Sequence, residues 1–198
     1  MFQIGKLFTQ SLISSFGTSS IAANATASTI ELLATIPAAA MGLALTTVVG
    51  HCVGADDYDA AKTYSKKMMK WAYIMLWIEN VIIIFLTPTI ASWYNLTPEG
   101  NYLAKKLIWY HSCCCMIAWP AAFTLPAILR ASGDVKFVMF SSIASMWIFR
   151  IALAYVIGGY FKLGVFGVWI AMTIDWLVRS ILNVWRLKSG KWMKQSVV

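Results

Sequence analysis

Long apolar stretches alternate with short polar ones along this chain. Five of the apolar stretches, at about 27–49, 69–91, 107–129, 137–160 and 164–185, reach the roughly 20 residues that a helix needs to cross a bilayer. Residues 1–17 form a shorter apolar stretch, which we interpret as the end of another helix. Polar turns such as Gly54-Ala55-Asp56-Asp57 separate the stretches. The pattern predicts an all-α integral membrane protein with five full transmembrane helices plus the end of a sixth.

Three prolines fall inside the predicted spans, at Pro37, Pro120 and Pro126. A proline within a membrane helix removes one backbone hydrogen bond and kinks the helix, which neighbouring helices can accommodate. We therefore predict helix kinks at these positions. Pro120 and Pro126 either open backbone carbonyls toward a cavity or only curve their helix.

Composition and charge agree with this interpretation. The 198 residues are 60% hydrophobic and 12% charged, with a mean hydropathy of +0.69, whereas a soluble domain needs more charge to cover its surface. The net charge of +8 would suit nucleic acid, but the basic residues cluster in the short polar stretches, as membrane topology requires. We expect the lipid bilayer as a partner, and no nucleic acid.

The lysines and arginines also predict an orientation. Alternate polar stretches carry most of them, namely Lys62, Lys66, Lys67, Lys70, Arg130, Lys136, Arg186, Lys188, Lys191 and Lys194. The remaining stretches carry Lys105, Lys106 and Lys162. Because cytoplasmic loops are enriched in Lys and Arg, we expect the first set and the C-terminus in the cytoplasm. The protein is then a multi-pass protein of the cytoplasmic (inner) membrane.

Three ionisable residues are predicted near the middle of the bilayer: Glu79, Arg150 and Asp175. At a rise of about 1.5 Å per residue, each lies roughly 15 Å or more into its own apolar stretch. A charge at this depth costs about 2.5–3.5 kcal/mol on insertion scales and is tolerated when it faces a partner, a cavity or a transport path. These residues are therefore candidates for a cation or substrate pathway.

Arg150 and Asp175 lie at similar depth on neighbouring antiparallel spans, which predicts an ion pair between them. That pair either belongs to the pathway or is a structural clasp without a transport role. Arg179 follows Asp175 by one helical turn and is a competing partner. Glu31 lies near the outer end of its span and is expected to reach outward to the interface.

The sequence contains no motif for hydrolysis or nucleotide binding. No glycine-rich phosphate loop, G-x-S-x-G or H-E-x-x-H occurs. Cys113, Cys114 and Cys115 are consecutive, so on a helix they point in different directions and cannot form a tetrahedral metal site. We expect no enzymatic activity, no metal site and no cofactor, with H⁺ or Na⁺ as the suspected coupling ion.

Several segments resemble, in the same order, those of the multidrug and toxic compound extrusion (MATE) family. LTTVVGHCVGADDYDAAKTY is similar to that family's VG…GA…A junction, and FGTSSIAANATASTI to the segment between the first two helices of a half. LPAILRASGDVKF resembles the LR…GD loop, and WIFRIALAYVIGGYFKLGVFGVWIAM the paired eleventh and twelfth helices.

The resemblance implies that residues 1–198 are the C-terminal lobe of a twelve-helix transporter, beginning inside its seventh helix. Such proteins export amphipathic, often cationic small molecules in exchange for H⁺ or Na⁺. Multidrug efflux by antiport is thus the expected function, and a missing N-terminal lobe or a second copy is the expected partner. The acids that the family often places in helices seven and ten have no counterpart in residues 1–16 or 107–129.

Two alternatives stay open at this point. One is a lipid-linked sugar flippase of the same superfamily, which shares the lobe architecture. The other is a non-transporting, truncated membrane subunit. The length of the chain indicates either a fragment or a natural truncation.

Overall fold

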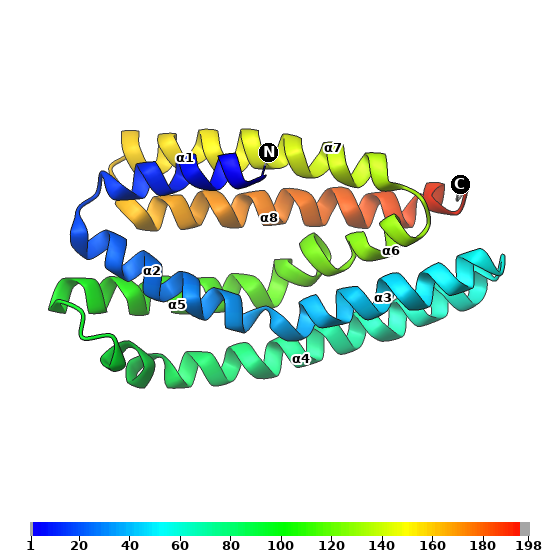
Figure 1. Ribbon diagram of the computed structural model, residues 1–198, viewed down its shortest axis with the longest axis horizontal. Coiled ribbons are helices and arrows are strands. Elements are labelled where there is room, and N and C mark those ends of the chain that lie inside the picture. The colour runs from blue at the N-terminus through cyan, green and yellow to red at the C-terminus, as the bar shows by residue number, and fades with distance from the viewer. Residues whose placement is uncertain (1, 195–198) are drawn as a thin grey trace.

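The computed structural model describes residues 2–194, with side chains described for residues 7–193. Met1 of the expected partial helix and the side chain of Lys194 in the basic tail lie outside these ranges. The described residues contain helices and no β-strand, and the long helices run roughly along one axis (Figure 1). The elements are α1 (Phe2–Ser14), α2 (Thr18–Ala34), α3 (Ile36–Gly54), α4 (Tyr58–Trp93), α5 (Pro98–Trp119), the π-helical η1 (Pro120–Thr124), α6 (Pro126–Ala131), α7 (Val135–Ser145), the π-helical η2 (Met146–Ala152) and η3 (Tyr155–Tyr160), α8 (Gly164–Lys188) and the short η4 (Lys191–Lys194).

Five helical stretches are long and apolar enough to cross a membrane. They are Ile36–Gly54, Tyr58–Trp93, Pro98–Ala131, Val135–Tyr160 and Gly164–Lys188. The short α1 precedes them and lies beside η2 and α8 (Figure 1). The predicted all-α membrane fold, with five full helices and the end of another, is therefore confirmed.

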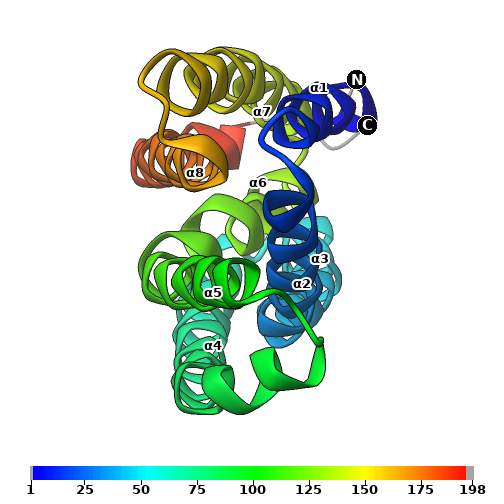
Figure 2. The same cartoon turned by 90° about the vertical axis from the view of Figure 1, so that its left-hand side faces the viewer.

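The helices form two layers. Seen along the bundle, α1, α7 and α8 make one layer and α2 to α5 the other, with α6 between them (Figure 2). The turns α3–α4 and α6–α7 and the C-terminal helix lie at one end, and the turns α1–α2, α4–α5 and α7–α8 at the other (Figure 1). The polar stretches that carry most of the lysines and arginines are thus gathered at one end of the bundle.

The helix caps explain where two of the long helices begin. At the start of α4, the Asp57 side chain accepts a 2.9 Å hydrogen bond from the Ala60 N–H. At the start of α5, the Thr97 hydroxyl accepts one of 3.2 Å from the Gly100 N–H. Both caps satisfy backbone donors that the first turn of a helix leaves unpaired.

Each of the three prolines singled out from the sequence lies at a helix irregularity. Pro37 follows a break at Thr35 that separates α2 from α3. Pro120 begins the π-helix η1, in which the Leu125 N–H donates to the Pro120 carbonyl at 2.8 Å. Pro126 begins α6.

The carbonyls freed around these prolines are used inside the bundle. A proline at position i leaves the carbonyl at i−4 without its helical donor. Trp77 Nε1 of α4 donates to the Met116 carbonyl at 2.9 Å, four residues before Pro120. Asn183 Nδ2 of α8 donates to the Ala122 carbonyl at 3.3 Å, four residues before Pro126. These carbonyls are therefore bound by side chains of neighbouring helices and do not open toward a cavity.

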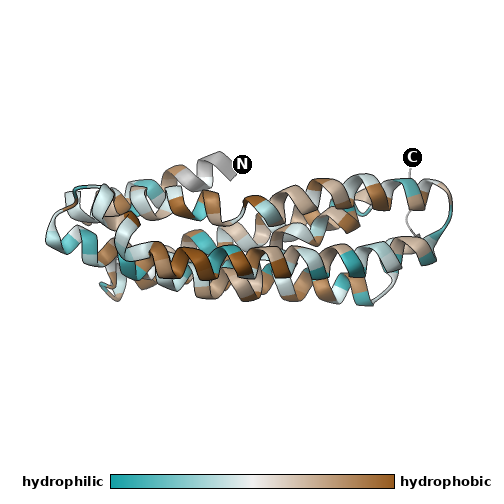
Figure 3. Cartoon of the chain, turned by 90° about the horizontal axis from the view of Figure 1, so that it is seen from below, coloured by the Kyte–Doolittle hydropathy of each residue, from teal (hydrophilic) through white to brown (hydrophobic). Residues whose placement is uncertain are grey.

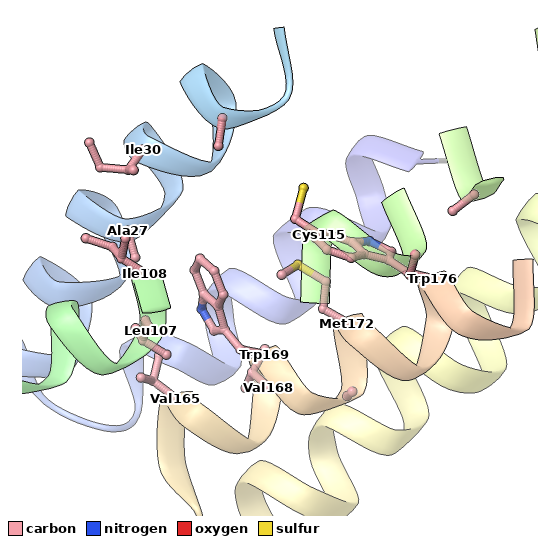
Figure 4. Close-up of a cluster of buried hydrophobic side chains, with 14 of the residues drawn as sticks. Ala27, Ile30, Leu107, Ile108, Cys115, Val165, Val168, Trp169, Met172 and Trp176 are labelled. Atoms are coloured by element: carbon pink, nitrogen blue, oxygen red, sulfur yellow. The ribbon is translucent and has the colours of Figure 1, made fainter. Parts of the chain in front are cut away.

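The buried side chains form one cluster at each end of the bundle. In one cluster, side chains from α2, α5 and α8 meet around Trp169 and Trp176 (Figure 4). In the other, Leu45 of α3 packs with Ile128 and Leu129 of α6. Large apolar side chains also cover the outside, where Leu43 is 76% and Phe85 is 78% exposed, and hydrophobic residues run along the middle of the helices (Figure 3). An apolar outer surface is what a bilayer requires.

Close backbone contact joins α8 to the end of the preceding span. A Cβ atom on Gly167 would lie 2.8 Å from both the Cα and the N of Gly158. No side chain fits in that space, so glycine at position 167 allows the two backbones to meet. This contact fixes how α8 is placed against η3.

Candidate functional site

A polar cleft lies between the two layers of the bundle. Its volume is about 570 Å³, and its walls come from α1, α2, α5, η1, η2 and α8. The polar and charged side chains on the walls are Thr9, Gln10, Asn24, Ser28, Glu31, Thr35, Arg150 and Arg179. The aromatic ones are Trp119, Phe123, Trp169 and Trp176. An otherwise apolar bundle thus contains a hollow whose walls carry an acid, two arginines and four aromatic rings.

Helical spacing on α2 and α8 places these side chains on the cleft. On α2, the polar lining residues Asn24, Ser28, Glu31 and Thr35 follow one another at intervals of three or four positions. Such spacing keeps side chains on one face of a helix. The two helices are tied together at the cleft wall, where Trp169 Nε1 donates to Asn24 Oδ1 at 2.9 Å.

Asp175 is fully buried on α8 and pairs with Arg179, one turn later on the same helix. Arg179 Nε lies 2.8 Å from Asp175 Oδ1, and the Ser145 hydroxyl of α7 donates to the same oxygen. The second carboxylate oxygen, Oδ2, has no hydrogen-bond partner. Asp175 therefore lies directly behind the arginine that lines the cleft.

The predicted ion pair between Arg150 and Asp175 is wrong. Arg150 Nη2 instead donates to the Met172 sulfur at 3.2 Å. The antiparallel register of the two helices explains this. Ser145 lies opposite Asp175, so Arg150, five residues after Ser145, lies opposite Met172, about one turn before Asp175. Arg179 reaches the carboxylate from its own helix at i+4, which is a favourable helical spacing.

Arg179 also separates the cleft from a second hollow. This second hollow is about 380 Å³ and lies between η1, α6 and α7, toward the lysine-rich end. Phe123 and Arg179 line both hollows, and the Arg179 guanidinium lies 5.6 Å from the centre of the Phe123 ring. A cation over an aromatic face is attracted to it, so this pair forms a partition between the cleft and the second hollow.

Glu79 lies apart from the other two candidates. It is half-buried on α4 and lines an apolar hollow with Ile30, Pro37 and Ile83. One of its carboxylate oxygens, Oε2, is buried without a hydrogen-bond partner. The structure thus brings Arg150 and Asp175 to the cleft region but leaves Glu79 in a different hollow. A role for the three in a pathway stays a prediction.

Glu31 is the cleft residue that the sequence interpretation placed wrongly. It was expected to reach outward to the interface, but it is half-buried on the cleft wall. A signal for it existed, namely the polar stripe of Asn24, Ser28, Glu31 and Thr35 within an apolar helix. The predicted span 27–49 concealed it, because it put Glu31 near an outer end. In the structure that stretch is divided between α2 and α3, and Glu31 lies in the last turn of α2 (Thr18–Ala34).

His111 and the cysteines contribute no metal-binding group to the described part of the chain. His111 is 2% exposed and packs edge-on against the rings of Trp169 and Trp176, at 5.7 and 5.4 Å between centres. Cys115 is buried, Cys114 half-buried and Cys113 exposed. Over residues 2–194, no group of three or more His, Cys, Asp or Glu side chains could hold a metal ion.

The chain is similar in sequence to a family of membrane proteins and to several of its members. Residues 1–156 match the sequence profile of the family described as MatE. The probable multidrug resistance protein NorM of Halalkalibacterium halodurans is 28% identical over 177 residues, which cover 89% of this chain and 38% of that protein. The probable multidrug resistance protein NorM of Thermotoga maritima is 28% identical over 203 residues, which cover 100% of this chain and 42% of that protein.

Solved structures share the fold at lower identity. A MATE structure in the straight conformation matches with a TM-score of 0.84 and 21% identity, over 98% of this chain and 44% of the other. The outward-facing and inward-facing structures of a multidrug resistance MATE family transporter match with TM-scores of 0.83 and 0.79, each at 22% identity. This chain therefore spans less than half the length of the proteins it resembles.

Proposed function

Because this chain belongs to the MATE family, we propose that it forms the C-terminal lobe of a secondary-active multidrug efflux protein in the cytoplasmic membrane. The observation that carries the proposal is the cleft itself, in which charged side chains and four aromatic rings meet inside an apolar helix bundle. Aromatic and apolar walls suit amphipathic compounds, and a few polar groups orient them.

The acids at the cleft would couple export to cation entry. Glu31 lines the cleft, and Asp175 presents an unpartnered Oδ2 behind Arg179. Binding of H⁺ or Na⁺ to either carboxylate removes a negative charge beside Arg150 and Arg179, which weakens the hold on a cationic compound. Glu79 is retained as a further candidate because one of its oxygens is also buried and unpartnered. Intramembrane acids of this kind are typical of ion and proton pathways.

Alternating access requires a second unit that rocks against this one. The missing N-terminal lobe, or a second copy of this chain, would supply it and would cover the cleft. The similar match to outward-facing and inward-facing structures supports a lobe that keeps its fold while it moves. The C-terminus would lie in the cytoplasm, at the lysine-rich end.

Efflux from cells or proteoliposomes that contain the full transporter tests this proposal. We expect export of an amphipathic cationic dye to depend on a proton or sodium gradient. Glu31→Gln and Asp175→Asn should each slow export by about tenfold or more, whereas Glu99→Gln, in the exposed first turn of α5, should not. Gradient-independent export, or full activity in both cleft variants, would contradict the assignment. Expression level and melting temperature separate loss of function from loss of fold.

A second candidate function is the flipping of a lipid-linked sugar. Two arginines on the cleft wall, Arg150 and Arg179, favour it, because guanidinium groups bind phosphate well. A lipid-flipping assay run beside the dye assay separates the two functions. A non-transporting membrane subunit would be active in neither.

A further inference from the structure

A groove on the outside of the bundle is distinct from the cleft and from the second hollow beside Arg179. It has a volume of about 420 Å³ and lies between α4, the η1–α6 segment, α8 and η4. Its walls are mainly apolar, with Met69, Leu125, Ile128, Val184 and Leu187 among them. An apolar groove of this kind can receive a hydrocarbon chain.

Lysines surround this groove, and its lining contains no acid. Lys62 and Lys66 come from α4, and Lys188 comes from the end of α8. The Lys62 ammonium lies 3.2 Å from Asp59, a residue whose side chain is 94% exposed to solvent. Over the described residues, Lys66 and Lys188 form no ion pair. The groove therefore presents positive charge without nearby compensation at two of its three lysines.

A buried hydroxyl also lines the groove. Ser65 lies between the two α4 lysines in sequence and is only 5% exposed. Its Oγ has no hydrogen-bond partner. A buried polar atom without a partner is unfavourable, so a ligand that accepts a hydrogen bond from Ser65 would remove that cost.

The groove lies away from the cleft. The cleft is lined by Trp119 and Phe123, whereas the groove is lined by Ala121, Leu125 and Ile128 of the same helical segment. Residues two positions apart point to nearly opposite sides of a helix. The groove thus opens on the face of the lobe turned away from the cleft, at the lysine-rich end.

We propose that this groove binds an anionic phospholipid of the cytoplasmic leaflet. An acyl chain lies along the apolar walls, and the phosphate meets Lys62, Lys66 and Lys188 and accepts a hydrogen bond from Ser65. Basic pockets between membrane helices on the cytoplasmic side are suited to such head groups. The proposal uses the predicted orientation of the lobe but no step of dye export, so either can fail without the other.

Native mass spectrometry of the purified protein, extracted from vesicles of phosphatidylglycerol and phosphatidylcholine, tests the proposal. The protein should retain phosphatidylglycerol in preference to phosphatidylcholine. The triple variant Lys62→Gln, Lys66→Gln, Lys188→Gln should reduce this retention by about tenfold or more, because these three lysines line the groove and would make charge-assisted hydrogen bonds to the bound phosphate. Val184→Phe, which narrows the groove without a charge change, should also reduce it.

The matched control is Lys67→Gln, Lys70→Gln, Lys136→Gln. These lysines are exposed at the same end of the bundle but do not line the groove. The control removes the same charge and should leave retention within about twofold of the unaltered protein. Equal loss in the two triple variants, no loss in the groove variant, or no preference for phosphatidylglycerol would each overturn the proposal. Melting temperatures verify that all variants are folded.

Discussion

Asp175 and Arg179 form a buried ion pair next to the cleft. Asp175 is fully buried, and its partner Arg179 is 5% exposed, so neither charge has much access to water. Removing one partner of such a pair leaves an uncompensated buried charge, which costs about 3–5 kcal/mol. The pair lies within α8, and the Ser145 hydroxyl of α7 connects the same carboxylate to the neighbouring helix, while Asp175 Oδ2 has no hydrogen-bond partner.

A double-mutant cycle tests this pairing. Asp175→Asn and Arg179→Gln should each lower the stability of the detergent-solubilised protein, and the double variant should recover part of the loss. The cycle that combines Asp175→Asn with Arg150→Gln should be additive within about 0.5 kcal/mol, because Arg150 contacts Met172 instead. The measurement is the free energy of unfolding. Coupling in the second cycle and not in the first would restore the pairing expected from sequence.

The sequence predicts Arg150 and Asp175 at similar depth on neighbouring spans, but it does not decide whether Arg150 or Arg179 pairs with Asp175. The choice depends on the register of α7 against α8. The π-helical segment η2, which contains Arg150, changes the direction of its side chains relative to an α-helix. Nothing in the apolar pattern from Val135 to Tyr160 marks that segment.

At the contact between α4 and α5, a tryptophan of each helix donates a hydrogen bond to a backbone carbonyl of the other helix. Pro120 of α5 frees the Met116 carbonyl, which Trp77 of α4 binds at 2.9 Å. Pro88 of α4 frees the Ile84 carbonyl, which Trp109 of α5 binds at 3.2 Å. Each helix thus supplies the donor that a proline in the other has removed, and this arrangement allows both irregularities within the membrane.

Trp77→Phe and Trp109→Phe should each destabilise the protein by about 0.6–1.7 kcal/mol, the range for hydrogen bonds between membrane helices. Trp71→Phe is the matched control, because Trp71 is 55% exposed on the same α4 helix. Thermal unfolding in a fixed detergent measures the difference. An equal effect of all three substitutions would show that ring size, rather than the hydrogen bond, matters.

The contact between α8 and η3 gives another prediction for helix packing. Gly167→Ala would put a Cβ within 2.8 Å of the Gly158 backbone, so the helices must separate. Overpacking of this kind costs about 1–3 kcal/mol, and the melting temperature should fall accordingly. Gly50→Ala is the control, since nothing lies within 4 Å of its added Cβ. Equal melting temperatures for the two variants would contradict close contact at Gly167.

Prolines and glycines mark where a helix is irregular, but they do not name its neighbours. The sequence locates Pro37, Pro120 and Pro126. It does not show that Trp77 and Asn183 donate hydrogen bonds to the carbonyls that Pro120 and Pro126 leave free. Whether a tryptophan N–H points to lipid or to a carbonyl depends on the rotation of its helix within the bundle. The same limit hid the cleft, because Glu31 and Arg179 come together only when α2 and α8 are packed.

For the whole molecule, the distribution of charge decides how the lobe sits in the bilayer. The two ends of the bundle differ strongly in basic residues, and an excess of Lys and Arg indicates the cytoplasmic side. The lipid proposal depends on this orientation, because the groove must face the cytoplasmic leaflet. The orientation also decides which side of the membrane the second hollow, beyond the partition of Phe123 and Arg179, faces.

Cysteine labelling measures that orientation directly. In a variant without the native cysteines, Lys136→Cys should react with a membrane-impermeant maleimide only after the cells are opened, because the α6–α7 end is predicted to be cytoplasmic. Lys162→Cys, at the opposite end, should react in intact cells. Both positions are exposed, so accessibility does not bias the result. The reverse pattern would place the lysine-rich groove in the outer leaflet and would remove the basis for a cytoplasmic lipid site while leaving the cleft unchanged.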